Sequence, residues 1–462
     1  MNTKTDTFSE GYPRLGILKY LFLSICFSLL LPSVMAQDLS LSDAHGLLLE
    51  NNGRFKSAVF NTEKTSEEKK AQQGLHYPSL VISGTYLHLQ DDISVDLTPQ
   101  RDLVAGFLQI DDPEALGDWQ RLLQGQDFAF ASAELSWPLF TGGRINAANE
   151  AASLRHDMAH DQQDLQENGL TIQLIETYYG AKLTYELVEL RQEVLSSVQR
   201  HKERADKFFA NGIIAEVETL NAEVALSNAQ RELKAAQKDY SLTETALKKL
   251  IGFEQFDNLS SLFKSPETVT ALEQYQEKML QNNIQLQLLH KTEELTKTGI
   301  KAEKSAYLPS LAVVGNYRFF NENLALGQVN WYVGLGMEWN IFNGFQREHK
   351  IKAAELNQLK ADATKIQVEK DLLTYTERLY STMEKQFDLF IGLEKEEQLA
   401  ERLKFMRERA FQQGLGTSLE VIDATMRLSQ IQFLKLQALY EFSKTKGELM
   451  VHIGETEDYI QQ

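Results

Sequence analysis

The sequence predicts a mixed α/β membrane protein made of two internal repeats, in which short strands face lipid and long helices extend away from them. Three observations support this fold class: long stretches without proline, a sequence that matches itself, and strands that alternate between apolar and polar residues. Among 462 residues there are only 8 prolines, and none lies in 139–265 or 310–462. Because proline ends or kinks a helix, these stretches favour very long helices over a β-sandwich or an α/β enzyme.

The composition excludes several other classes of protein. Charged residues make up 24% of the chain and hydrophobic residues 43%, which is typical of a folded protein rather than a disordered chain or a helical membrane bundle. The formal net charge is −18 and no basic face is available to neutralise phosphates, so we expect no nucleic acid partner.

Residues 1–36 are predicted to be a secretory signal peptide. Arg14 and Lys19 precede a short apolar run, and the small-residue pattern Val34-Met35-Ala36 predicts cleavage directly after it. The only cysteine, Cys26, lies inside this segment, where a bulky preceding residue and a continuing apolar run disfavour a lipid anchor. We therefore expect the mature chain to be exported with neither a disulfide nor a thiolate metal site.

The chain matches itself at a fixed spacing. At an offset of 202 residues, Trp137-Pro-Leu-Phe-Thr-Gly142 aligns with Trp339-Asn-Ile-Phe-Asn-Gly344, and twelve of the 41 positions from 212 to 252 are identical. Upstream the offset becomes 231, where Pro78-Ser-Leu matches Pro309-Ser-Leu, so the first copy carries 29 extra residues in between. The chain therefore contains two copies of one structural unit.

Each repeat is expected to run helix, strand, loop, strand, long helix, tight turn, helix. The first repeat, 37–265, is predicted to contain a helix, a strand over 78–90, an outer loop over 90–127, a strand over 128–138, a long helix over 144–210, a helix over 216–250 and an equatorial segment over 251–268. The second repeat, 266–462, is predicted to contain a helix over 270–306, strands over 309–319 and 331–340, a long helix over 346–411 and a helix over 418–453.

The strands show the pattern of membrane-spanning strands. From Trp331 to Asn340 the odd positions are large and apolar, the even positions are mostly small or polar, and tryptophan occurs near both ends. A single strand of this kind is more often half of a soluble hairpin, but four of them at matching places in an exported chain favour lipid contact. Four strands cannot close a barrel and hydrocarbon does not tolerate an open edge, so several copies must share one barrel.

The helices show the pattern of a hollow helical tube. The helix over 216–250 carries apolar or small residues at strict 3-4 spacing, which is a coiled-coil seam. The long helix before it carries two stripes, one through Leu174 and Tyr178 and one through Ile175 and Tyr179, so that it contacts neighbours on both flanks. Taken alone, the helices would suit a soluble coiled-coil scaffold equally well.

With these features in place, the chain resembles the TolC family of outer-membrane efflux proteins over essentially all of its mature sequence. The residues that carry the likeness are the Pro-Ser-Leu strand starts at 78–80 and 309–311, Trp137-Pro-Leu-Phe-Thr-Gly-Gly-Arg144, Ile341-Phe-Asn-Gly344, and Phe411-Gln-Gln-Gly-Leu-Gly-Thr-Ser-Leu-Glu-Val-Ile-Asp-Ala424, echoed by Asn211-Gly-Ile-Ile-Ala-Glu-Val-Glu218. The resemblance implies a homotrimer in which each protomer gives four strands to a shared twelve-stranded β-barrel and long helices to a periplasmic α-helical barrel.

The resemblance also implies a function. The chain would be a passive exit duct of a tripartite efflux or type I secretion system, located in the outer membrane with a periplasmic helical extension. Its partners would be outer-membrane lipid, a periplasmic membrane-fusion adaptor and an inner-membrane pump of the RND or ABC type. The alternative is an exported coiled-coil scaffold or adhesin that opens no channel.

Two helix turns are the candidate adaptor-docking tips. By the resemblance these are Gly212-Ile213-Ile214 and Gly414-Leu415-Gly416-Thr417. Glycine permits the positive φ of a reversal, and an exposed Ile or Leu offers an apolar anchor. A plain helix turn is the alternative for these residues.

Glu420 and Asp423 match the acidic pair that lines the family's periplasmic constriction. They share one helix face, so a trimer would gather six carboxylates in a ring that attracts cations; otherwise they are simply solvated. The family often closes this aperture with a tyrosine and an arginine, where this chain has Phe411 and Ser418. We therefore expect other contacts, including Glu218, to hold the closed state, and Glu218→Ala to raise single-channel conductance; an unchanged conductance would contradict this role.

The sequence carries no motif for catalysis. His-Glu-x-x-His, the Walker phosphate loop, Gly-x-Ser-x-Gly and the dinucleotide glycine fingerprint are all absent, and the 9 histidines are scattered. We therefore expect no enzyme activity, no cofactor and no metal site.

Overall fold

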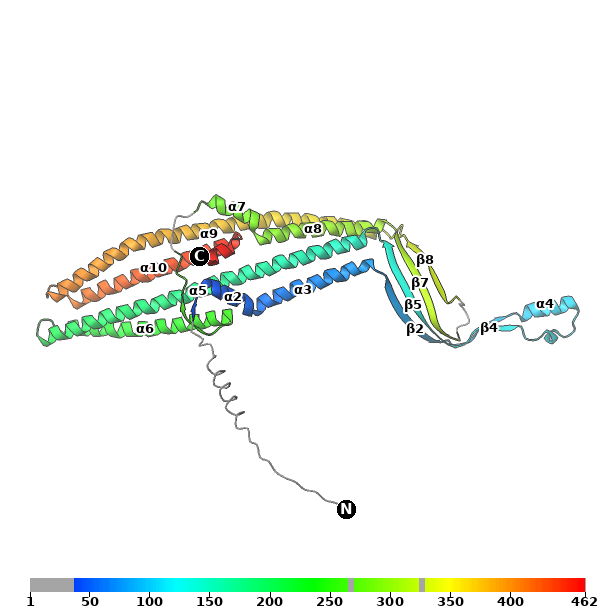
Figure 1. Ribbon diagram of the computed structural model, residues 1–462, viewed down its shortest axis with the longest axis horizontal. Coiled ribbons are helices and arrows are strands. Elements are labelled where there is room, and N and C mark those ends of the chain that lie inside the picture. Colours follow the sequence, from blue (N-terminus) through cyan, green and yellow to red (C-terminus); the bar gives the residue numbers. More distant parts are fainter. Residues whose placement is uncertain (1–36, 265–269, 324–328, 462) are drawn as a thin grey trace, which may run out of the picture.

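The computed structural model describes residues 37–264, 270–323 and 329–461. The predicted signal peptide, the end of the predicted equatorial segment and most of the short loop before Trp331 lie outside these residues. The chain is strongly elongated, with helical hairpin tips at one end, a β-sheet towards the other, and a narrow arm beyond the sheet (Figure 1). Within the described residues, no helix has both the length and the hydropathy needed to cross a bilayer.

Four strands form one antiparallel sheet in the order β2-β5-β7-β8. They are β2 (Ser79–His88), β5 (Asp127–Phe140), β7 (Ser310–Glu322) and β8 (Trp331–Glu338). The two halves of the chain meet at the centre of this sheet, where β5 of the first repeat pairs with β7 of the second. Within the described chain, β2 and β8 each pair on one side only, so the sheet has two free edges.

The register separates the sheet into an apolar and a polar face. Leu80 lies opposite Leu135, Leu135 opposite Gly315, and Val313 opposite Leu335, and residues directly opposite share a face. The apolar face therefore runs across all four strands through Leu80, Ile82, Tyr86, Leu135, Trp137, Leu311, Val313, Tyr317, Trp331, Val333, Leu335 and Met337. The other face carries Ser83, Ser132, Glu134, Asn316, Gly334 and Glu338.

Two helical hairpins extend from the sheet to the opposite end of the molecule (Figure 1). The long helices are α5 (Arg144–Ala210) and α9 (Gln346–Gln412), each of 67 residues and about 100 Å long. They return as α6 (Glu216–Ile251) and α10 (Ser418–His452). Helix α5 packs against α6 and also against α10 of the second hairpin, which agrees with its two apolar stripes.

The predicted coiled-coil seam between α5 and α6 contains both apolar and polar contacts. Leu233, Ala236 and Leu247 of the seam are buried, and Tyr240 meets the edge of Tyr185 with ring centroids 5.5 Å apart. At the next position of the seam, the hydroxyl groups of Thr184 and Thr243 form a hydrogen bond of 2.6 Å. The threonine pair satisfies both side chains inside the seam.

The helix predicted over 270–306 is two helices, and this prediction was wrong in that respect. The structure has α7 (Leu272–Asn282) and α8 (Ile284–Lys304), separated at Asn283. Asn283 has extended backbone, and its side chain accepts hydrogen bonds from the first turn of α8, so it ends one helix and caps the next.

The first repeat has the same break at Asn52, between α2 (Leu41–Asn51) and α3 (Gly53–Gln73). A short helix that was not predicted, α11 (Thr456–Gln461), follows α10 at the end of the described chain.

The segment predicted as an outer loop over 90–127 is a folded arm, which corrects that prediction. It contains β3 (Ile93–Asp96), α4 (Thr98–Leu108), a 3₁₀ turn (Pro113–Leu116) and β4 (Gln120–Gln124). Strands β3 and β4 pair with each other and carry α4 beyond the end of the sheet (Figure 1). The 29 extra residues of the first repeat therefore form a separate projection.

The middle of the molecule is held by a buried cluster around two tyrosines. Strand β1 (Gln37–Leu39) pairs in parallel with β6 (Phe256–Leu259), which lies in the predicted equatorial segment. The hydroxyl of Tyr178 donates to the Leu39 carbonyl at 2.7 Å and accepts from the Ser261 backbone N–H at 3.0 Å. Burial raises the pKa of the neighbouring Tyr179 to about 12.

Two hydrogen bonds of the first repeat recur at the corresponding positions of the second. Trp137 Nε1 donates to the carbonyl of His76 at 3.1 Å, and its counterpart Trp339 donates to the carbonyl of Tyr307 at 3.1 Å. The Asn52 amide reaches the carbonyl of Leu250, and Asn283 reaches that of His452 in the same way. The same spacings of 202 and 231 residues relate every partner, so contacts in one repeat predict contacts in the other.

Candidate functional site at the helix tips

Each helical hairpin reverses at a glycine. Gly212 has φ +71° and Gly414 has φ +73°, a backbone conformation that residues with a Cβ rarely adopt. The next residue in each turn donates back to the preceding helix: Ile213 N–H to Phe208 at 2.9 Å and Leu415 N–H to Ala410 at 2.9 Å. These bonds satisfy the last carbonyls of α5 and α9.

The predicted docking residues differ in what they present to a partner. Ile213 is 57% exposed and Leu415 is 81% exposed, so each tip ends in one projecting apolar side chain. Ile214 instead is partly buried and packs against a cluster formed by Ala205, Ala222, Phe411 and Val421. It supports the tip rather than projecting from it.

Gly416 and Thr417 shape the second turn. A Cβ on Gly416 would lie 3.2 Å from the Glu420 carboxylate and 3.3 Å from Ala410, so close packing favours glycine there. Thr417 is the N-cap of α10: its hydroxyl accepts from the Glu420 N–H at 3.3 Å, and the Glu420 carboxylate accepts from the Thr417 N–H at 3.1 Å.

The two hairpins are joined just above the tips by four residues, one from each helix. We call His201 of α5, Glu218 of α6, Phe411 of α9 and Ser418 of α10 the tip junction. His201 Nε2 lies 2.7 Å from Ser418 Oγ, and the Glu218 carboxylate accepts from the Ser418 backbone N–H at 2.6 Å. The His201 ring lies against Phe411 with centroids 4.7 Å apart.

The tip junction is closely packed, and three of its four side chains are buried. Ser418 and Phe411 are almost completely buried, and His201 is 7% exposed. Phe411 also stacks on Phe208, with ring centroids 5.6 Å apart. Phe411 and Ser418 are the two positions at which the chain departs from the resembled family. Both belong to the second hairpin and both contact His201 of the first, so they join one hairpin to the other.

Burial, together with the nearby positive charge of Arg204, lowers the pKa of His201 to about 4. The ordinary value is 6.5, so between pH 6.5 and 4 the unfolded chain binds a proton that the tip junction does not. Above pH 6.5 both states are neutral and stability is unaffected. As the pH falls towards 4 we expect His201 to cost about 3 kcal/mol of stability.

This pH dependence is measured by comparing thermal midpoints of the wild type and His201→Gln between pH 7 and 4. Glutamine still hydrogen bonds to Ser418 but does not titrate. The midpoint of the wild type should fall more steeply with acid. Equal slopes would contradict a buried neutral histidine.

The predicted constriction residues occupy different settings. Glu420 forms an ion pair with Arg407 of α9, with Nη1 2.8 Å from the carboxylate. Asp423 is exposed on α10. Glu218 belongs to the tip junction, where it caps α10. The structure therefore places Glu218 in contact with Ser418 and gives Glu420 a positively charged partner.

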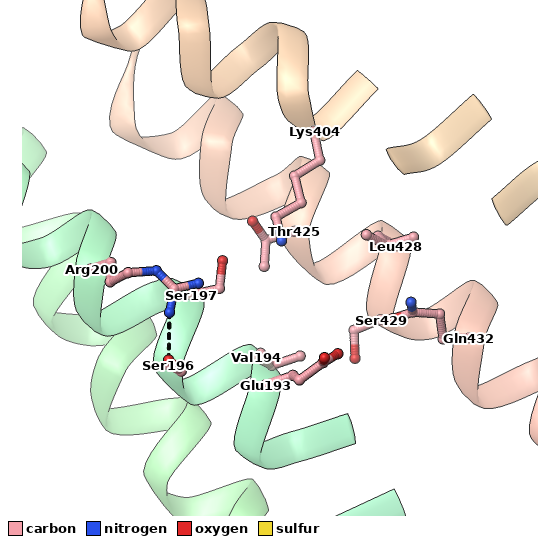
Figure 2. A pocket seen from close by; sticks show the side chains of 10 residues that line it. All are labelled: Glu193, Val194, Ser196, Ser197, Arg200, Lys404, Thr425, Leu428, Ser429 and Gln432. Atoms are coloured by element: carbon pink, nitrogen blue, oxygen red, sulfur yellow. Dashed lines mark hydrogen bonds between the residues drawn. The ribbon is translucent and has the colours of Figure 1, made fainter. Parts of the chain in front are cut away.

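A polar groove lies between α5 and α10 above the tip junction. Figure 2 shows its lower cavity, of about 280 Å³, with Arg200, Lys404, Glu193 and Gln432 around it. Arg200 donates to Ser196 at 2.6 Å. A second cavity of about 450 Å³ continues the groove and shares Glu193 and Gln432 with the first.

Half of the residues that line the lower cavity have counterparts of the same type in the other repeat. At the offset of 202, five of its residues have a counterpart of the same type: Arg200 with Arg402, Lys404 with Lys202, Leu428 with Leu226, Ser429 with Ser227, and Gln432 with Gln230. These counterparts lie on α5, α6 and α9, and most are exposed in the single chain.

Sequence reasoning missed His201 and Arg407. A lone histidine on a long helix gave no sign of a partner 217 residues away, although the tight spacing of Phe411 and Ser418 around the turn pointed to the right place. Arg407 could have been found from its position thirteen residues before Glu420, across the predicted turn.

Comparisons with known proteins agree with this architecture. A family model described as "Outer membrane efflux protein" matches residues 115–253 and 276–455. Outer membrane protein TolC of Vibrio cholerae serotype O1 is 22% identical over 377 residues, covering 78% of this chain and 82% of that protein.

Solved structures share the fold. CusC is similar with a TM-score of 0.72 and 14% identity over 90% of this chain and 92% of its own. VceC of Vibrio cholerae gives a TM-score of 0.68 and 15% identity over 90% of this chain and 96% of its own. At such identities the structural likeness establishes the fold, which is the one predicted from the sequence.

Proposed function

Because this chain belongs to the outer membrane efflux protein family, we propose that three copies form one exit duct, passive in itself, through which an inner-membrane pump expels its substrate. The family consists of channel proteins of the outer membrane rather than enzymes. The single observation that carries the trimeric duct is the open sheet: an apolar face four strands wide with a free edge on each side. Lipid does not tolerate such edges, so they must pair with other copies.

Internal duplication supplies the register of that pairing. In the chain β5 pairs with β7, with Leu135 opposite Gly315. In the repeat relation β8 is the counterpart of β5, and β2 is the counterpart of β7. The pairing of β5 with β7 therefore predicts that β8 pairs with β2 of the next protomer, with Met337 opposite Gly84. The neighbouring pairs become Leu335 with Tyr86 and Trp339 with Ile82. All six residues belong to the apolar face or continue it, so the lipid-facing surface stays continuous around the barrel.

The helices support the same arrangement. Helix α5 contacts α10 within the chain, and the repeat relation places α9 against α6 of the next protomer. Both of these faces carry apolar stripes that are exposed in the single chain: Leu399, Leu403 and Met406 on α9, and Val217, Leu220 and Val224 on α6. Their burial would complete a closed helical tube.

The experiment that tests this function is reconstitution of the processed protein into planar lipid bilayers. A trimer in detergent that gives stable single-channel currents supports the duct. A monomer that dissolves in plain buffer and never inserts into vesicles would contradict it and would favour the exported scaffold.

The projecting tip residues suit docking to a periplasmic adaptor. Ile213 and Leu415 are apolar anchors at the ends of rigid hairpins, and the grooves between hairpins repeat the same arginine, lysine, leucine, serine and glutamine around a trimer. We expect Leu415→Asp to weaken binding of the purified adaptor about 30-fold, because a buried apolar anchor is worth about 2 kcal/mol.

Gln413→Asp is the matched control, since it adds the same charge to the same turn without removing an apolar side chain. Adaptor binding is measured on immobilised trimers. Equal losses for both variants would show that charge alone matters and would contradict an apolar anchor.

A further inference from the structure

We propose that a small cavity between β5 and the start of α5 binds the primary ammonium group of a phospholipid head group from the periplasmic leaflet of the outer membrane. The cavity has a volume of about 120 Å³, and His76, Ile145 and Asn146 are among the residues that line it. It lies within one chain, and only the lipid around it rests on the proposed function. The ligand is inferred from the second repeat, where an arginine of the protein itself occupies the equivalent place.

Arg347 fills this place in the second repeat. It is the second residue of α9 and is only 8% exposed. Its guanidinium donates to the backbone carbonyls of Ala306 at 3.1 Å, Asn340 at 3.1 Å and Ile341 at 3.3 Å. The centroid of the Tyr307 ring lies 4.0 Å from Cζ of Arg347, which is a cation–π contact. Three carbonyl groups and an aromatic ring thus form a receptor for a cation.

The first repeat has the same receptor without the arginine. At the offsets of 231 and 202, the three carbonyl groups become those of Leu75, Pro138 and Leu139, and Arg347 becomes Ile145. His76 takes the place of the aromatic ring. Isoleucine has no polar atom in its side chain, so it cannot bond these carbonyl groups, and a cavity remains beside it.

The local backbone agrees between the two repeats, so the comparison holds in three dimensions. The Ile145 N–H donates to the Thr141 hydroxyl at 3.2 Å, and the Arg347 N–H donates to the Asn343 side chain at 3.4 Å. The tryptophan bonds described above recur beside them. The start of a helix is unfavourable for a cation, but Arg347 is held at one by the equivalent carbonyl groups.

The cavity lies at the level where the membrane meets the periplasm. Trp137, on the apolar face of the sheet, donates to the carbonyl of His76, which lines the cavity. Tryptophan is enriched at membrane interfaces, and the two apolar residues Leu139 and Phe140 beside the cavity are about half exposed. A lipid head group is therefore the source of a cation at this level.

The surrounding charges favour a head group that carries a phosphate as well as an ammonium. In the second repeat Arg347 has a carboxylate partner in Glu348, 3.4 Å away. The first repeat has Asn146 in place of Glu348 and Arg144 in place of Gln346. A bound cation thus meets a neutral amide, whereas Arg144, exposed at the start of α5, offers its guanidinium to a phosphate. A zwitterionic phospholipid meets both conditions.

Lipid exchange tests the site because its carbonyl groups need N–H donors. The ammonium of phosphatidylethanolamine has such donors, whereas the quaternary ammonium of phosphatidylcholine has none. We expect wild-type trimers to unfold about 2 °C or more higher in phosphatidylethanolamine nanodiscs than in phosphatidylcholine nanodiscs. Ile145→Arg supplies a guanidinium covalently, so its thermal midpoint should be the same in both lipids. The matched control, Ile145→Leu, should keep the wild-type difference.

Methylguanidinium identifies the source of the cation. If it raises the midpoint of the wild type in phosphatidylcholine but the two lipids give equal midpoints, the cavity takes a soluble organic cation and the lipid proposal is overturned. If the wild type responds neither to the lipid nor to methylguanidinium, the cavity holds water only, and the cation site itself is overturned.

Arg347→Ala gives a second test that does not depend on the folding of Ile145→Arg. It opens the equivalent cavity in the second repeat, so methylguanidinium should restore part of the thermal stability that the variant loses. Native mass spectrometry should then find one further phosphatidylethanolamine molecule per protomer. Failure of both would overturn the inference from Arg347. All variants are first shown to conduct as trimers in planar bilayers, so a negative result counts against the cavity, whereas absence of wild-type trimers counts against the duct.

Discussion

Phe411→Ala is expected to open the duct at its tips and to raise its single-channel conductance by a factor of about two or more. Phe411 is buried, and its ring packs against His201 and Phe208, which connects α9 to α5 near the turn. Removing a buried phenylalanine ring costs about 3–5 kcal/mol, far more than a surface change. The loss falls on the junction that fastens the two hairpins together, so the closed state should lose most of that stability.

The control for Phe411→Ala is Phe405→Ala, on the same helix and two turns earlier. Phe405 is half exposed, and the guanidinium of Arg409 lies over its ring. Conductance of the control should match the wild type. Equal conductance for Phe411→Ala and the wild type would show that the tip junction does not hold the closed state.

Leu335→Arg is expected to prevent stable insertion into the membrane. Leu335 lies in the middle of β8 on the apolar face, opposite Val313. An arginine near the middle of the bilayer on the lipid side of a barrel costs about 2–4 kcal/mol, and a trimer would bear that cost three times. The expected result is loss of heat-resistant trimers and of membrane-inserted protein.

Tyr332→Arg is the matched control, because Tyr332 lies on the same strand and opposite Asn316 on the polar face. A charge there meets the lumen, so trimers should form and only conductance should change. If Leu335→Arg and Tyr332→Arg behave alike, the assignment of the two faces is wrong.

The general architecture could be predicted because it depends on local patterns of apolar, polar and proline residues along the sequence. Helices of 67 residues leave long runs without proline, and β8 alternates between large apolar residues and mostly small or polar ones, although the two strands of the first repeat alternate less regularly. The internal duplication made the prediction firmer, because each pattern occurs in both repeats. The breaks at Asn52 and Asn283 were missed because asparagine within an apolar stripe resembles an ordinary surface residue until its side chain is seen to cap the next helix.

The folded arm was missed for a related reason. Strands β3 and β4 are only 4 and 5 residues long, and they are stabilised by pairing with each other rather than by an apolar pattern. Pro99 at the start of α4 was a usable signal, since proline is favoured in the first turn of a helix.

The candidate site shows the limit of sequence reasoning most clearly. The glycines of both tips could be predicted from the turn chemistry, and the resemblance pointed to Glu218 and Glu420. The partner of Glu218 depends on how the two hairpins meet, because Glu218 contacts Ser418, 200 residues away, whereas Glu420 contacts Arg407 of its own hairpin. Only the packing of the first hairpin on the second sets the distance from Glu218 to Ser418.

The most direct measurement is oxidative crosslinking of Gly84→Cys with Met337→Cys in native membranes. Residues directly opposite on paired strands have Cα atoms about 4.5–5.5 Å apart, which a disulfide spans. If three chains close one barrel edge to edge, this pair should yield a covalent trimer, whereas Gly84→Cys with Glu338→Cys, on opposite faces, should not. Monomers from the first pair, or closed rings of another size, would contradict the shared lumen.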